Sequence, residues 1–187
     1  MDPRIARTRS SLRQALFALT RERSLDEISI SDIAERAGIN RSTYYQHYSD
    51  KDTLLAEALD AVIDDAIGSE RPLTEAAGER ILLEYLRHVE GHAELYRSLL
   101  GEGGSATIQV RMSRRLQEII VQAFETGGPH GPTGIPTEVT AAAIAGSALA
   151  AVRAWLDFSP LPTAEVASGW IWTVIQSHVP NPVDDTQ

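Results

Sequence analysis

The segment from Ile28 to Leu55 constrains the fold of this chain more than any other, because its residue order fits two short helices joined by a glycine turn. Ser29 is followed three residues later by Asp32, which is the order of a capping box at a helix start. Ala34 and Gly38 lie one turn apart, so two helices can cross closely there, and Gly38 can adopt the left-handed conformation that ends a helix. The segment therefore predicts two short helices in tight contact.

The second helix of this segment begins with polar side chains. Asn40 is a good N-cap, and Arg41, Ser42 and Thr43 then occupy the first helical turn. In helix-turn-helix proteins this end of the second helix enters the major groove of DNA and touches base edges. Arg41 can pair bidentately with guanine, and Thr43 can offer its hydroxyl to a base or its methyl group to thymine. The first turn is therefore the candidate for base recognition.

Contacts to DNA phosphates are predicted further along the same segment. Tyr45, His47 and Lys51 carry a phenol, an imidazole and an ammonium, which can meet phosphate oxygens. Such contacts fix the position of a protein on DNA and carry no sequence information directly. The full set of predicted DNA-binding residues is Arg4, Ser29, Arg41, Ser42, Thr43, Tyr45, His47 and Lys51.

This segment resembles the DNA-binding domain of the TetR/AcrR family of transcriptional repressors. One departure is Tyr44, where the family commonly has an inward-packed Leu, so the ring must enter the small core or tilt outward. The resemblance covers about the first third of the chain, and the remainder is similar in being helical and of the right length. The matching positions are Ile33-Ala34, Ala37-Gly38, Ile39, Asn40, Ser42-Thr43, Tyr45, His47-Tyr48 and the run from Ser49 to Leu55.

Charge is distributed unevenly along the chain. The formal net charge of −9 is unfavourable for DNA binding, because attraction to phosphates is the main source of affinity. Residues 1–52, however, hold nine basic and eight acidic residues, a net charge of +1, which leaves −10 for residues 53–187. We expect DNA to repel the acidic remainder and so to orient the molecule. The basic residues at the N-terminal end are Arg4, Arg7, Arg9 and Arg13.

The rest of the chain shows apolar residues at helical spacing almost throughout, so the predicted fold class is all-α. With the resemblance, we expect a three-helix helix-turn-helix domain over residues 1–50, a helical effector-binding and dimerisation domain over 51–180, and a frayed tail over 181–187. Ser49 and Asp52 have the order of a second capping box, with a helix start near Asp50. Helices are expected at about 4–23, 51–67, 81–89, 93–100, 106–126, 137–158 and 163–179, with a flexible Gly- and Pro-rich loop at 127–136.

The last two expected helices are apolar over too wide an arc for one partner each. The resemblance implies that they pair with their copies in a second subunit. Such a homodimer would bind a palindromic operator in double-stranded DNA, with half-sites about 34 Å apart or a multiple of that distance. The resemblance also implies a repressor that an unknown small-molecule effector releases from this operator.

Candidate ligand-binding residues lie on the helices after the one expected at 51–67, which connects the two expected domains. Aromatic residues at helical spacing are also typical of plain core, so we expect most of those in these helices to be structural. A closed cavity would favour a small ligand, whereas a solid core with an exposed apolar patch would favour a protein partner, and that alternative stays open. The candidates are Tyr85, Val89, Tyr96, Met112, Phe124 and Trp155.

Two clusters of titratable residues have simpler interpretations than a binding site. Glu84, His88 and His92 share a helix face, but Glu90 does not sit where the His-Glu-x-x-His zinc motif needs it, so no metal is predicted. The arginines within residues 111–115 could bind an anionic effector, although such a cluster is usually the solvated side of an amphipathic helix. No cofactor is predicted.

Composition and motifs argue against other classes of protein. The sequence lacks Cys, a nucleophile elbow and a metal-ligand set, which disfavours a helical enzyme. It has no uninterrupted apolar run of about 18 residues, so no membrane segment is predicted. The N-terminus shows no apolar signal core, and we therefore expect a cytoplasmic protein without a membrane partner.

Overall fold

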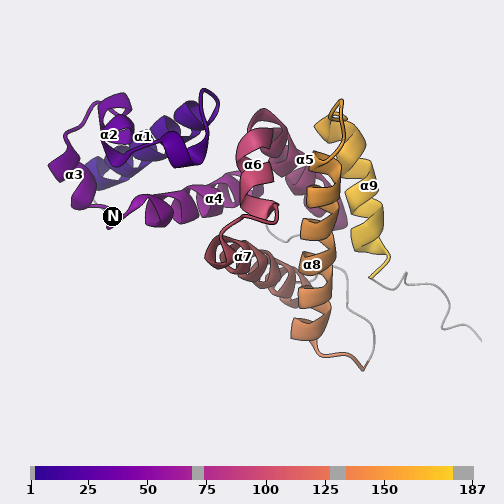
Figure 1. Cartoon of the computed structure of the whole chain (residues 1–187). Coiled ribbons are helices and arrows are strands. Elements are labelled where there is room, and N and C mark those ends of the chain that lie inside the picture. The colour runs from indigo at the N-terminus through magenta and orange to yellow at the C-terminus, as the bar shows by residue number, and fades with distance from the viewer. Residues whose placement is uncertain (1–2, 69–73, 127–133, 179–187) are drawn as a thin grey trace, which may run out of the picture.

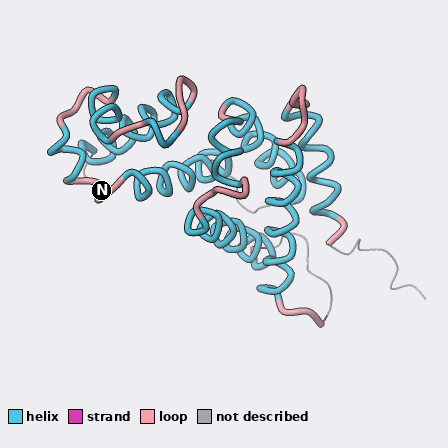
Figure 2. The backbone as a smooth tube through the Cα atoms, viewed as in Figure 1, coloured by secondary structure: helices cyan, strands magenta, loops and turns pink. Residues whose placement is uncertain are grey.

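The computed structural model describes residues 3–68, 74–126 and 134–178, and over these residues the chain is helical without any strand (Figure 1). A small N-terminal group of helices is joined by one connecting helix to a larger helical body (Figure 2). The all-α fold class predicted from apolar periodicity is confirmed.

The N-terminal group consists of α1 (Pro3–Thr20), a 3-10 helix (Leu25–Glu27), α2 (Ile30–Arg36) and α3 (Arg41–Tyr45). The connecting helix is α4 (Lys51–Ile67), and the body contains α5 (Glu75–Gly91), α6 (Ala93–Leu100), α7 (Ala106–Glu125), α8 (Thr137–Leu156) and α9 (Ala164–Gln176). The first helix ends earlier than expected, and the 3-10 helix was not predicted. Most of the predicted loop at 127–136, and the whole tail at 181–187, lie outside the described residues.

The Tyr44 ring belongs to the core of the N-terminal group. Leu12 and Leu16 of α1 and Ile33 of α2 are fully buried, and the Tyr44 ring is fully buried in the same core. Its hydroxyl donates to the backbone carbonyl of Asp50 at 2.8 Å, which satisfies the polar end of the ring. Burial raises the pKa of this phenol well above its ordinary value. The tyrosine thus packs inward.

α4 begins with a different cap from the predicted one. The side chain of Asp50 accepts from the Thr53 amide at 2.7 Å, and the Ser49 hydroxyl donates to the Asp50 carboxylate at 2.8 Å. The expected capping box of Ser49 with Asp52 is therefore wrong, although the helix starts where predicted. A carboxylate at the N-cap satisfies the same orphan amide that a serine hydroxyl would.

α4 also links the N-terminal group to α7. Asp60 accepts from Arg111 Nη2 at 2.6 Å, and Asp64 pairs with Arg115. These pairs are partly exposed, so each contributes little to stability, but they tie the position of α4 to that of α7. The buried side of α4 consists of Leu54, Leu55, Ala56, Ala58, Leu59, Ile63 and Ile67.

α1 touches the body directly through Phe17, which meets His88 of α5 and His92, the residue between α5 and α6. The Phe17 ring meets His88 edge-on, with centroids 4.7 Å apart, and lies 5.0 Å from His92. The two imidazoles stack at 4.2 Å. Beside them, Nε of Arg21 donates to the Gly91 carbonyl at 3.4 Å. These contacts form a second junction between the N-terminal group and the body.

Contacts within the protein engage the side chains of Glu84, His88 and His92. Nδ1 of His92 lies 2.9 Å from the His88 carbonyl oxygen, and Glu84 pairs with Arg87 at 2.6 Å. The part of the chain that the structure describes contains no group of three or more side chains that could hold a metal ion.

His88 makes this junction sensitive to acid. Its Nε2 is buried without a hydrogen-bond partner, and burial lowers its pKa from 6.5 to about 4, aided by the nearby His92 and Arg21. Between these values the unfolded chain binds a proton that the folded chain does not, so stability is lost as pH falls below 6.5. We expect the free energy of unfolding to be about 1–2 kcal/mol lower at pH 5 than at pH 7, after allowance for solvent screening.

Urea unfolding followed by circular dichroism at the two pH values measures this loss. His88→Phe keeps an aromatic ring against Phe17 and removes the titrating group, so most of the loss should disappear in that variant. The same loss in the variant as in the wild type would contradict the assignment to His88.

α8 is both long and strongly apolar. An 18-residue window of this helix has a mean hydropathy of 1.5. Among the described helices, it is the one that is long and apolar enough to cross a membrane, by length and composition alone. Core helices of soluble proteins have the same length and composition, and α8 packs against α7 and α9. Small and polar residues interrupt this helix, so it contains no uninterrupted apolar run of about 18 residues.

Candidate nucleic-acid interface

The first helix of the predicted motif starts and ends as expected. The Ser29 amide donates to Asp32 Oδ2 at 2.8 Å, and the Asp32 amide donates to Ser29 Oγ at 3.2 Å, which confirms the capping box. The Ser29 amide, then its hydroxyl, and Arg23 hold the pKa of the Asp32 carboxyl below its ordinary value. Gly38 has a φ of 69°, and no atom lies within 4 Å of a Cβ built there, so the turn needs glycine for backbone conformation and not for space.

Asn40 caps α3 as predicted. Its Oδ1 accepts from the Thr43 amide at 2.8 Å, the Thr43 hydroxyl at 2.9 Å and the Ser42 hydroxyl at 2.6 Å. One side-chain oxygen therefore orders the whole first turn. Because both hydroxyls point back to the cap, a contact to DNA as a donor requires either of them to rotate.

Arg41 and Tyr45 form an exposed pair on α3. Nη2 of Arg41 donates to the Tyr45 hydroxyl at 3.2 Å, and its guanidinium carbon lies 5.5 Å from the ring centroid. Tyr45 remains 46% exposed. A guanidinium has five N–H donors, so this contact leaves most of them for a base edge or a phosphate. The structure brings these two predicted DNA contacts together on one helix face.

Tyr48 anchors the segment after α3 from its buried side. Its hydroxyl donates to Glu57 Oε1 at 2.6 Å, and Nη1 of Arg13 donates to the same oxygen at 3.1 Å. Arg9 lies 3.6 Å from the other carboxylate oxygen and places its guanidinium over the Tyr48 ring. This cluster fixes α1 and α4 to the end of the recognition segment. It also uses two of the arginines that the sequence assigned to a basic N-terminal end.

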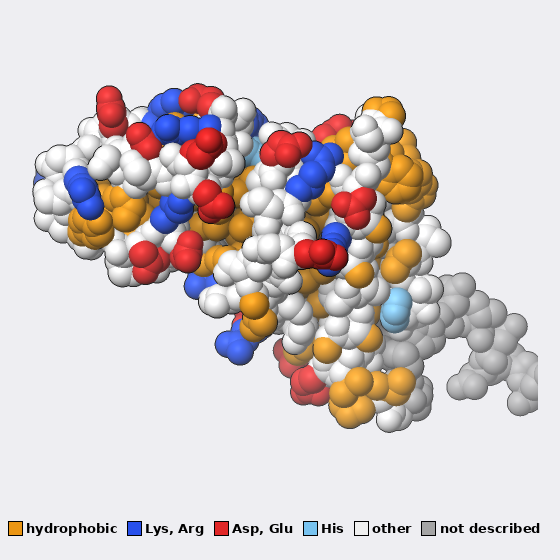
Figure 3. Space-filling view, in the orientation of Figure 1, with side chains coloured by type: hydrophobic (Ala, Val, Ile, Leu, Met, Phe, Trp, Pro, Cys, Tyr) orange, Lys and Arg blue, Asp and Glu red, His pale blue; other side chains and the backbone are white. Residues whose placement is uncertain are grey.

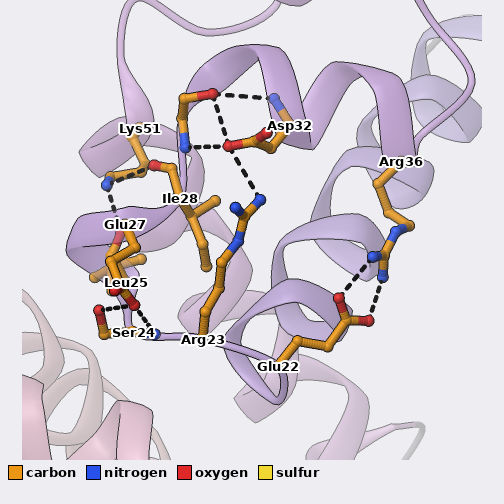
Figure 4. A network of polar contacts seen from close by, with 10 residues as sticks. Glu22, Arg23, Ser24, Leu25, Glu27, Ile28, Asp32, Arg36 and Lys51 are labelled. Carbon is orange, nitrogen blue, oxygen red and sulfur yellow. Dashed lines mark hydrogen bonds and ion pairs between the residues drawn. The ribbon is translucent and has the colours of Figure 1, made fainter.

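Ion pairs fix α2 against the end of α1. Figure 4 shows Arg36 facing Glu22, with two guanidinium nitrogens each 2.8 Å from a carboxylate oxygen. Arg23 lies 3.0 Å from Asp32 in the same view. Bidentate pairing of this kind adds geometric specificity as well as energy, so it sets the angle of α2.

Lys51 makes hydrogen bonds inside the protein that the sequence did not suggest. Its Nζ donates to the carbonyl oxygens of Leu25 and Ile28 at 2.6 and 2.9 Å, at the end of the 3-10 helix (Figure 4). Two of the three ammonium protons are thus used inside the protein. Lys51 is therefore a structural link, and its phosphate contact, through the remaining proton, stays a prediction. The sequence did not suggest this link because the 3-10 helix was not predicted.

The remaining predicted DNA contacts are Arg4, Ser29 and His47. Arg4 is exposed at the start of α1, Ser29 is exposed with its hydroxyl in the capping box, and His47 is half-buried after α3. Gln46, which was not among the predicted contacts, is exposed beside Tyr45, and a glutamine amide can pair with an adenine edge. Its position at the C-cap of α3 was the available signal.

A separate cavity of about 190 Å³ lies in the body, between α4, α5, α7, α8 and α9. Of the predicted ligand-binding residues, Tyr85 and Phe124 line it. The other four, Val89, Tyr96, Met112 and Trp155, are buried core residues outside its lining, so the cavity does not support their predicted role. Helical phase shows which side of a helix is buried, but not whether that side meets a neighbour or a void. Lining residues that were missed include Ile63, Ile119, Ala148 and Ile175.

The N-terminal part of the chain matches a known family. Residues 12–58 match the model of the bacterial regulatory proteins of the tetR family. A stretch of 56 residues is 41% identical to the uncharacterized HTH-type transcriptional regulator YxbF of Bacillus subtilis (strain 168). This stretch is 29% of the chain and 15% of that relative, so the match concerns only a small part of the relative's length.

Solved structures extend the similarity over most of the chain. A tetR-family regulator from Streptomyces coelicolor is 25% identical, with a TM-score of 0.62 over 91% of this chain and 80% of that chain. FadR of Thermus thermophilus, a repressor in complex with lauroyl-CoA, shares the fold at 13% identity, with a TM-score of 0.61 over 96% of this chain and 98% of that chain. These matches favour a regulatory protein over an enzyme. Motif, family model and fold agree: residues 12–58 match the tetR family of bacterial regulatory proteins, and the fold of most of the chain is similar to solved tetR-family regulators.

Proposed function

We propose that this protein is a cytoplasmic transcriptional regulator that binds a palindromic operator in double-stranded DNA as a homodimer. The observation that carries the proposal is the exposed face of α3, where Arg41 at the start of the helix and Tyr45 at its end project together. Tyr44 and Tyr48 hold this short helix from its buried side, which leaves its N-terminal end available to a major groove.

An apolar face on α8 and α9 supports the homodimer. Val166, Trp170 and Val174 lie four residues apart on α9 and are 45%, 48% and 37% exposed. The Phe158 ring, just after α8, lies 5.9 Å from that of Trp170. Figure 3 shows hydrophobic side chains gathered over α9. Pairing of this face about a two-fold axis would present two α3 helices to a two-fold symmetric operator.

The cavity supports regulation by a small molecule, which makes a protein partner the less favoured alternative. Its walls include Ile63 of α4 and Trp172 of α9, so an occupant would touch both the connecting helix and a helix of the proposed dimer face. A ligand that favours another separation of the two α3 helices must weaken operator binding, with a coupling of about 1–3 kcal/mol. The lauroyl-CoA complex of FadR supports a ligand site in this fold. We therefore propose a repressor released by its effector.

Arg41→Ala is expected to weaken binding to the specific operator by about 1–3 kcal/mol and to relax the preference at one base pair. The reason is the loss of a guanidinium that can pair bidentately with a base. Fluorescence anisotropy with labelled duplexes that differ at single positions measures both effects.

Arg114→Ala is the matched control, because Arg114 is exposed on α7 in the helical body. It should leave operator binding within error of the wild type. Unchanged discrimination between duplexes in Arg41→Ala, or an equal loss in Arg114→Ala, would rule out base reading by Arg41.

A further inference from the structure

The cavity in the helical body has walls made almost entirely of hydrocarbon. Ile81 and Leu82 come from α5, Ile119 from α7, and Leu149 and Val152 from α8. Such walls offer few hydrogen bonds to water, which needs two to four polar partners to occupy a buried site. An apolar occupant would gain contact with every wall and displace no well-bound water.

The volume of the cavity sets the size of the occupant. Apolar cavities of about 150 Å³ in protein cores stay dry and bind benzene or xenon. The cavity here measures about 190 Å³. It therefore has room for a single aromatic ring that carries one or two small substituents.

The polar groups of the lining are few and do not favour a charged occupant. No Arg, Lys or His is found among the described lining residues. Thr74 uses its hydroxyl oxygen to accept from the Ala77 amide at 3.2 Å, and the Glu75 carboxylate accepts from Gln176. An anion would meet the Glu75 charge without any compensating cation, and burial of an unpaired charge in an apolar site is costly. A cation would find only this exposed, already hydrogen-bonded carboxylate.

One wall depends on the close approach of α9 to α5. A Cβ built on Gly78 would lie 2.8 Å from Cη2 of Trp172, so the absence of a side chain there lets the indole lie against α5. On α8 the lining residue Ala148 is small. A larger side chain at this position would occupy space that is now part of the cavity.

From these observations we propose that the cavity binds a small uncharged apolar molecule of about one aromatic ring. That this molecule is also the effector rests on the proposed function, because the cavity is bounded by Ile63 of α4 and by Trp172 and Ile175 of α9.

Three probes that share one ring test the chemical class. Isothermal titration calorimetry of the full chain at pH 7 compares toluene, benzoate and benzylammonium, which differ in the charge of a single substituent. Toluene is expected to bind at least about tenfold more tightly than either ion. Benzoate or benzylammonium binding as tightly as toluene would overturn the proposal.

Ala148→Phe tests the location, because the ring should fill the cavity and abolish toluene binding. The control is Ala76→Phe, the same substitution at an exposed position of α5, which should bind toluene like the wild type. A cooperative thermal transition of Ala148→Phe by circular dichroism shows that it folds. Phe124→Ala enlarges the cavity and should bind naphthalene more tightly than the wild type does. Toluene binding by Ala148→Phe at wild-type affinity, or no gain for naphthalene in Phe124→Ala, would place the ligand elsewhere.

Operator binding is measured separately, so the two proposals can fail independently. Calorimetry with toluene needs no DNA. Toluene that binds but leaves the operator affinity unchanged would overturn the effector role. Failure of the wild-type protein to bind any operator would instead overturn the proposed function, and the ligand class would stand on the calorimetry.

Discussion

Trp155→Ala is expected to lower the free energy of unfolding by about 3–5 kcal/mol. The Trp155 side chain is only 2% exposed, and its indole N–H donates to the Pro162 carbonyl at 2.9 Å. The substitution removes a large buried aromatic surface, leaves a void in the core and deprives that carbonyl of its donor. Urea denaturation followed by circular dichroism measures the change.

Trp155→Phe provides a graded control. It keeps most of the buried ring but loses the N–H donor, so a smaller loss of about 1–2 kcal/mol is expected. A loss below about 1 kcal/mol for Trp155→Ala would show that this side chain is not part of a close-packed core, and would return it to the set of candidate ligand contacts.

Trp170→Glu is expected to dissociate the proposed homodimer and to weaken operator binding about 30-fold or more, since hot-spot aromatics contribute about 2 kcal/mol or more. Trp170 is 48% exposed in the single chain and lies at the centre of the apolar stripe of α9. The substitution removes an aromatic anchor and places a carboxylate where the two subunits would meet. Sedimentation equilibrium and operator anisotropy on the same samples measure the two effects.

Val110→Glu is the matched control for that prediction. Val110 is 60% exposed, but it lies on α7, outside the α8 and α9 face. It should leave both the oligomeric state and operator binding unchanged. A Trp170→Glu protein that stays dimeric would exclude this face as the subunit interface.

The DNA-binding segment could be predicted from sequence because its determinants are local. The Ser29 capping box, the Gly38 turn and the Asn40 cap each involve residues at most a few positions apart, and the structure contains all three. One local rule failed between near-equivalent partners. At the start of α4, Asp50 supplies the cap in place of the expected pair of Ser49 and Asp52.

Contacts between distant residues could not be predicted in this way. The Lys51 ammonium reaches carbonyl groups more than twenty positions earlier, at Leu25 and Ile28. The cavity depends on how five helices pack, and helical periodicity cannot distinguish a core residue such as Trp155 from a lining residue such as Phe124. Periodicity determined the elements, and tertiary packing determined the site.

Selection of bound duplexes from a random pool by the wild-type protein tests most directly whether paired α3 helices read an operator. We predict enrichment of an inverted repeat whose half-sites lie about one helical turn apart, or a multiple of it, and loss of one preferred base pair per half-site with Arg41→Ala. Enrichment of no sequence, of a site without two-fold symmetry, or of an unchanged motif with Arg41→Ala would contradict that claim.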